Sequence, residues 1–69
     1  MGKIRLKVRE FADEKGWTLR EVSERTEIPY ATVKNYAKAE MATIDYTALI
    51  KLARVFEVSI EDLVEVIED

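Results

Sequence analysis

The chain has 69 residues, neither cysteine nor histidine, and a formal net charge of −3. Without these two residue types it can form no disulfide, no typical zinc site and no histidine-based catalytic centre. Its two glycines, Gly2 and Gly16, cannot build a glycine-rich phosphate loop. We therefore expect no enzyme, no cofactor, no metal site and no small-molecule ligand.

The length predicts a single domain over residues 1–69. Hydrophobic residues make up 48% of the chain, enough for a core, and no apolar run approaches the roughly 18 residues of a membrane span. The first ten residues alternate charged and apolar side chains, which is not the pattern of a signal peptide. Together with the absence of cysteine, this predicts a cytoplasmic protein.

Charge is unevenly distributed along the chain. Residues 1–38 contain nine Lys or Arg and six Asp or Glu, a balance of +3. Residues 39–69 contain two basic and eight acidic residues, a balance of −6. The basic first half keeps nucleic acid open as a partner, although the whole chain is acidic.

The spacing of apolar residues is helical almost throughout and predicts an all-α fold. The five predicted helices cover about residues 3–15, 19–26, 29–38, 45–56 and 60–67. The first has one apolar face, made of Ile4, Val8, Phe11 and Ala12, and Gly16 is expected to end it. The segment LVEVIE, residues 63–68, has the composition of a strand, but the helical reading is preferred.

Capping residues and a proline predict the boundaries of the other helices. Thr18 and Glu21 have the spacing of a capping box at the start of the second helix. Pro29 prevents that helix from continuing and suits the first turn of the third. Two further N-caps are expected at Asp45 and Ser59. The expected inward positions are Trp17 before the second helix, Val33 and Tyr36 in the third, and Tyr46, Leu49, Leu52, Ala53 and Phe56 in the fourth.

Residues 19–26 and 29–38 form two short predicted helices joined by a short turn, which is a helix-turn-helix arrangement. The chain resembles the lambda-repressor-like, Cro/Xre-type helix-turn-helix family. The resemblance rests on Gly16-Trp17-Thr18, Glu21-Val22, Ile28, Val33, Tyr36 and the run LIKLARVFEVSIEDL at residues 49–63. Members of this family are mostly bacterial or phage transcription regulators, often repressors, that bind operators in double-stranded DNA as dimers.

The resemblance implies which side chains would touch DNA. The base-reading positions are Tyr30, Ala31, Thr32, Lys34 and Asn35. The positions facing the DNA backbone are Thr18, Arg20, Lys38 and Thr43. The alternative is that Lys34 and Asn35 belong to a solvated helix face and that Tyr30 packs on the second helix. The basic residues near the N-terminus are expected to solvate the first helix, with contact to DNA as the alternative.

Five positions depart from the family pattern. Glu27 and Ala39 stand where members often have glycine. Because Glu27 has a Cβ atom, the turn before Ile28 is expected to differ slightly from the family's turn or to be slightly strained. Ala12 and Ala37 replace an Arg–Glu pair together, which keeps the interior free of an unpaired charge. Leu19 stands where relatives often place a glutamine against DNA, and leucine cannot donate a hydrogen bond to phosphate.

Two functions follow. The first is a sequence-specific DNA-binding regulator that acts as a homodimer, with a subunit contact at Val64, Val66 and Ile67 in the fifth helix region. The second is a protein-interaction module on the same fold, similar to an antitoxin or an adaptor, with weak or no DNA binding. An exposed apolar cluster would favour this second function, and its candidate members are Leu6, Leu19 and Val66.

Overall fold

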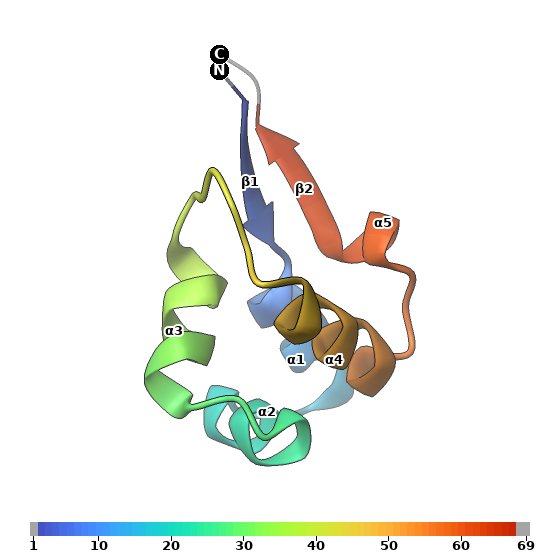
Figure 1. The fold of residues 1–69 in the computed structure, drawn as a ribbon. Coiled ribbons are helices and arrows are strands. Elements are labelled where there is room, and N and C mark those ends of the chain that lie inside the picture. Colours follow the sequence, from blue (N-terminus) through green and yellow to red (C-terminus); the bar gives the residue numbers. More distant parts are fainter. Residues whose placement is uncertain (1, 68–69) are drawn as a thin grey trace.

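A computed structural model describes residues 2–67 of the chain. Its elements, in chain order, are β1 (Lys3–Leu6), α1 (Val8–Lys15), α2 (Leu19–Thr26), α3 (Tyr30–Lys38), α4 (Tyr46–Phe56), α5 (Ile60–Leu63) and β2 (Val64–Ile67). The helices pack together while the two strands form a ribbon that projects from them (Figure 1). The five predicted helices are therefore present, and the protein is mainly helical. The all-α prediction is wrong near the two ends of the chain, where β1 and β2 form a small sheet.

The sheet joins residues near the two ends of the chain. β1 and β2 are antiparallel, with Leu6 opposite Val64 and Lys3 opposite Ile67. On the other side of β1, the backbone N–H and C=O groups of Ile4 both bond Met41, each at 2.7 Å. β1 thus lies between β2 and the loop that follows α3. Residues 3–6, predicted as the first turn of a helix, and residues 64–67, predicted as the last turn of one, are strands instead.

The pairing of the two segments explains why they are strands. Successive side chains of a paired strand point to opposite faces of the sheet, which places Ile4 and Leu6 on one face of β1 and Lys3 and Arg5 on the other. Leu6 is completely buried on the core side, so it is not part of an exposed apolar cluster as the sequence suggested. On the opposite face Arg5 donates from Nε to Glu65 Oε1 at 2.9 Å and also pairs with Glu10 of α1.

Away from the two strands, the helix boundaries lie within one residue of those expected from the sequence. Gly16 ends α1 with φ 75°. The backbone N–H groups at this C-terminus donate to the carbonyls of Ala12 and Asp13, as is typical where glycine ends a helix. The capping box is complete, because the Glu21 N–H donates to Thr18 Oγ1 at 3.2 Å and the Thr18 N–H donates to Glu21 Oε1 at 3.0 Å. Asp45 and Ser59 are the N-caps of α4 and α5.

The turn between α2 and α3 is held by side chains. Glu27 adopts a left-handed conformation with φ 61°, which bears out the expectation of strain at this position. Thr26 Oγ1 donates to the Val22 carbonyl at 2.7 Å and accepts from the Ile28 N–H at 3.3 Å. Ser23 Oγ donates to the Ile28 carbonyl at 2.6 Å. Ala39, by contrast, ends α3 in an extended conformation that any residue can adopt.

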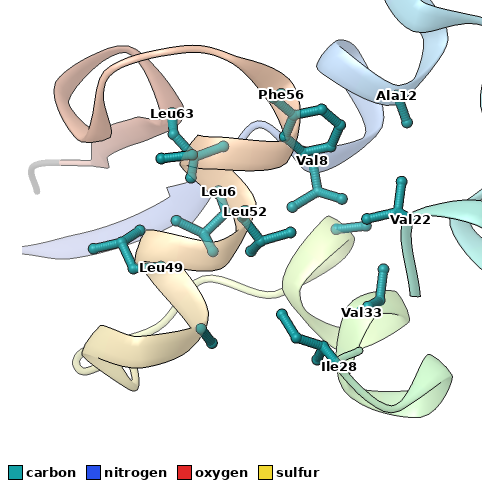
Figure 2. Packing of buried hydrophobic residues seen from close by; sticks show 13 residues of the cluster. Leu6, Val8, Ala12, Val22, Ile28, Val33, Leu49, Leu52, Phe56 and Leu63 are labelled. Atoms are coloured by element: carbon teal, nitrogen blue, oxygen red, sulfur yellow. The ribbon is translucent and has the colours of Figure 1, made fainter. Parts of the chain in front are cut away.

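The core lies where α1, α2, α3, α4 and β1 meet (Figure 2). Its largest fully buried side chains are Phe56, Leu6, Leu52, Leu63, Val8, Val22 and Val33. Trp17 is half-buried against it, with its ring stacked 6.0 Å from that of Phe56. Tyr46 was predicted to face inward but is 67% exposed, because it occupies the first turn of α4 beyond the edge of the core.

Ala12 and Ala37 are both buried, and both belong to the cluster that forms the core. Small apolar side chains at these positions let α1 and α3 approach without a buried charge. None of the helices within residues 2–67 has the length and apolar character needed to span a bilayer.

Candidate nucleic-acid interface

Helix α3 has one buried and one exposed side. Val33 and Ala37, four residues apart, are buried against the core, and Tyr36 is partly buried beside them. Because successive residues turn by about 100°, Asn35 and Ala31 point away from that core, as their exposure confirms. α3 is therefore fixed by a narrow apolar stripe and presents most of its circumference outward.

Four of the five base-reading candidates lie together. A shallow hollow of about 300 Å³ on the outer side of α3 is lined by Tyr30, Ala31, Lys34, Asn35 and Lys38. Lys38, the candidate for a backbone contact, borders the same hollow. This surface carries two ammonium groups, one amide and one phenol hydroxyl, which are groups that can donate to base edges or to phosphate oxygens.

Thr32 lies apart from the other base-reading candidates. It is half-buried on the flank of α3 that faces α4, where a second hollow of about 260 Å³ also includes Tyr36, Thr47 and Lys51. Its hydroxyl is therefore not part of the surface formed by Lys34 and Asn35.

The start of α2 borders a larger hollow of about 600 Å³. Its lining joins α1, the start of α2 and the start of α3 through Arg9, Ala12, Asp13, Trp17, Thr18, Leu19, Arg20 and Tyr30. The two candidates for backbone contacts, Thr18 and Arg20, lie here. Leu19 is half-buried and packs against the core, so it is a structural side chain at the edge of this hollow.

Tyr30 separates the two hollows and contacts cations from both. The guanidinium carbon of Arg20 lies 4.4 Å from the centre of its ring, and Lys34 Nζ lies 5.6 Å from it. The ring touches α2 through Arg20, and the residue is still 36% exposed.

Arg9 is a residue that the sequence analysis did not single out. It was assigned to the solvated surface of the first helix, yet it lines the larger hollow beside Asp13, one helical turn further on. The signal that could have identified it is its position three residues before the buried Ala12, which places it at the margin of the core-facing side of α1.

Thr43 is exposed in the loop between α3 and α4 and lines neither the hollow beside α3 nor the hollow at the start of α2. That loop runs beside β1 (Figure 1), where Met41 is bonded to Ile4. The structure thus brings Thr18, Arg20 and Lys38 close to the α3 surface but leaves Thr43 away from it. Within residues 2–67, no group of three or more acidic side chains is placed to hold a metal ion.

A small, mainly helical protein that presents a short helix with lysines and an asparagine outward, next to an arginine at the start of another helix, has the features of a nucleic-acid-binding module. Comparison with protein families identifies which kind. The model of the Cro/C1-type HTH DNA-binding domain matches residues 7–69, and the chain belongs to this family. Neither the curated proteins nor the solved structures gave a significant match.

Proposed function

We propose that the chain is a sequence-specific transcriptional repressor that binds double-stranded DNA as a homodimer on a pseudo-palindromic operator. In this proposal α2 and α3 are the helix-turn-helix, and α3 enters the major groove. The observation that carries it is the grouping of Tyr30, Ala31, Lys34 and Asn35 on the outer side of α3 in a chain of the Cro/C1-type DNA-binding family.

Each exposed side chain of α3 has a specific task in this proposal. Asn35 bonds N6 and N7 of an adenine at once, since its amide offers one donor and one acceptor side by side. Lys34 donates to guanine or to a neighbouring phosphate, while Ala31 packs against a thymine methyl group. Tyr30 offers its ring edge and hydroxyl at the N-terminal end of α3. Thr32 contacts the base or phosphate that lies toward the α4 flank.

The DNA backbone is held from both ends of this surface. Thr18 and Arg20 meet one phosphate at the start of α2, where the unpaired backbone N–H groups and the helix dipole favour an anion. Lys38 meets another phosphate at the C-terminal end of α3. Thr43 is the weakest part of this set, because its loop lies away from both hollows.

The homodimer is proposed to form through Val64, Val66 and Ile67. These residues lie on β2, so the contact is made by a strand and not by the predicted helix. β1 already bonds β2 on one side and Met41 on the other, which makes β2 the outer strand. Val66 is 65% exposed there. Antiparallel addition of a second β2 is compatible with the two-fold symmetry of a closed dimer.

Selection of bound duplexes from a random pool tests this function. We expect enrichment of a site with two inverted half-sites whose centres lie one helical turn apart, about 34–36 Å. Enrichment of a single half-site without symmetry would contradict the homodimer but keep DNA reading by α3. If no sequence is enriched, the proposal of sequence-specific binding is wrong.

A second candidate is a protein-interaction module with little affinity for DNA. The outer strand β2 with its exposed Val66 favours it, because an open strand edge is a common docking site for another chain. Leu6 no longer supports it, since this side chain is buried. Titration with random-sequence duplex at low salt helps to separate the two functions, because the absence of binding even there would favour the protein-interaction module.

A further inference from the structure

We propose that Tyr30 is a positioning residue whose ring holds Arg20 and Lys34 ready for one DNA phosphate. This inference deepens the proposed function and rests on it. It assigns to Tyr30 a task different from base reading, namely to fix the direction of two cations that come from different helices.

The geometry begins with the place of Tyr30 in the chain. It is the first residue of α3, directly after Pro29, so the ring stands at the junction between α2 and α3. Arg20, in the first turn of α2, lies 4.4 Å from the ring centre. Lys34 follows Tyr30 by four residues, which puts it one helical turn away on the same side of α3, and its Nζ lies 5.6 Å from the ring centre.

Two cations beside one ring are held together but also repel each other. The ring attracts each of them through its electron-rich face, an attraction that does not cancel the repulsion between two positive charges. An anion placed next to the ring would relieve this repulsion and pair with both. Arg20 lines the hollow beside α2, Lys34 lines the hollow beside α3, and Tyr30 lines both, so the phosphate is proposed to lie where the two hollows meet at this ring.

Holding the cations in advance has a measurable advantage. Arg and Lys side chains have many rotamers, and fixing them at the moment of binding lowers affinity. A ring that limits their motion in the free protein reduces this loss. The aromatic face supplies the attraction, so a phenylalanine should replace Tyr30 in this task, whereas a leucine of similar bulk should not.

The test is a double-mutant cycle measured with the duplex enriched by selection. We expect Tyr30→Leu to weaken binding about two- to fivefold, the equivalent of about 0.5–1 kcal/mol for an exposed cation–π contact. Tyr30→Phe should recover most of that loss. In a background that already carries Arg20→Ala and Lys34→Ala, Tyr30→Leu should cost nothing further, because no cation remains for the ring to hold.

Tyr46→Leu is the matched control, since Tyr46 is an exposed tyrosine in the first turn of α4. It should leave the affinity unchanged. Two results would overturn the inference while DNA binding itself stands. One is a Tyr30→Leu effect of the same size with and without the two cations. The other is a Tyr30→Phe variant as weak as Tyr30→Leu, which would assign the effect to the hydroxyl.

A measurement without DNA separates failure of this inference from failure of the proposed function. In the free protein, ring currents from Tyr30 should shift the side-chain proton resonances of Arg20 upfield, and NMR should show this shift in wild type and in Tyr30→Phe. It should disappear in Tyr30→Leu. Its absence in wild type would contradict the contact between Arg20 and Tyr30 whatever the outcome of the DNA experiments.

Discussion

Glu27 occupies a left-handed backbone conformation, φ 61°, which glycine adopts without strain. That conformation costs a residue with a Cβ atom about 1–2 kcal/mol, while glycine adds about 0.5–1 kcal/mol of chain entropy to the cost of folding. We therefore expect Glu27→Gly to stabilise the protein by about 0.5–1 kcal/mol. Thermal unfolding followed by circular dichroism measures this as a rise in Tm of several degrees.

Glu24→Gly is the control for that substitution. Glu24 is also an exposed glutamate, but it lies inside α2, where glycine costs about 1 kcal/mol relative to a good helix former. Its Tm should fall. If the Tm of Glu27→Gly fell as well, the strain assigned to Glu27 would be wrong.

Lys34 and Asn35 are the two residues on which the proposed base reading depends most. We expect the double substitution Lys34→Ala and Asn35→Ala to lower the preference for the enriched duplex over a scrambled one by at least about tenfold. The reason is that each good contact to a base is worth about 1–3 kcal/mol. Gel-shift competition between that duplex and a scrambled one measures the preference. The control is Lys3→Ala, which removes an exposed lysine on β1. It changes the net charge by the same amount and should leave the preference for the enriched duplex unchanged. An unchanged preference in the double variant would contradict the assignment.

The helices were easier to predict than the strands. α2 and α4 each begin at a side-chain cap, and Gly16 and Pro29 are strong local signals for the end of one helix and the start of another. KIRL and VEVI carry no such signal. Over four residues, apolar side chains alternate in a way that a strand and the end of a helix both permit, so only the pairing of β1 with β2 decides between them.

The candidate site was predictable to a similar degree. The base-reading positions on α3 followed from the family resemblance, and four of the five lie together. What could not be predicted depends on neighbouring elements. Thr32 faces α4 and lines a different hollow from the other base-reading candidates. Arg9 comes from α1. The loop that contains Thr43 is held beside β1 by the backbone bonds between Ile4 and Met41.

The ion pairs that join β1 to α1 and β2 should make the stability of the protein depend on pH in the acidic range. The ion pair with Arg5 holds the pKa of Glu10 below its usual range, and pairing with Glu10 and then Glu65 raises the pKa of Arg5. A carboxylate with a lowered folded-state pKa adds stability that is fully present above its unfolded pKa, about 4.3, and is lost as pH falls through the folded value.

We therefore expect wild type to exceed Glu10→Gln in Tm at pH 6–7 and the gap to narrow as pH falls below about 4. The gap should correspond to no more than about 1 kcal/mol, since the Glu10 side chain is half exposed and screened by solvent. Thermal unfolding of both proteins over a range of pH measures it. A gap that is independent of pH would show that the substitution acts through packing and not through charge.

At the scale of the whole molecule, the charge asymmetry seen in the sequence is also an asymmetry in space. The basic residues Arg20, Lys34 and Lys38 lie on α2 and α3. Acidic residues follow α4 and continue through α5 and β2, which lie on the side of the molecule away from α3 (Figure 1). An acidic surface there repels DNA, which favours approach of the duplex from the α3 side.

The sheet has a practical consequence for anyone who trims this protein. The family match begins at residue 7, yet β1 ends at Leu6, so a fragment cut at the family boundary lacks the whole strand. It would lose a fully buried leucine, the partner of β2 and the backbone bonds to Met41.

We expect the fragment 7–69 to be less stable than the full chain by more than about 2 kcal/mol, the least that removal of a buried leucine side chain usually costs. Urea titration of both proteins measures this, and Leu6→Ala in the full chain shows how much comes from the leucine alone. Equal stability of the fragment and the full chain would contradict a structural role for β1. The region that defines the family and the region that folds as a unit differ by one strand.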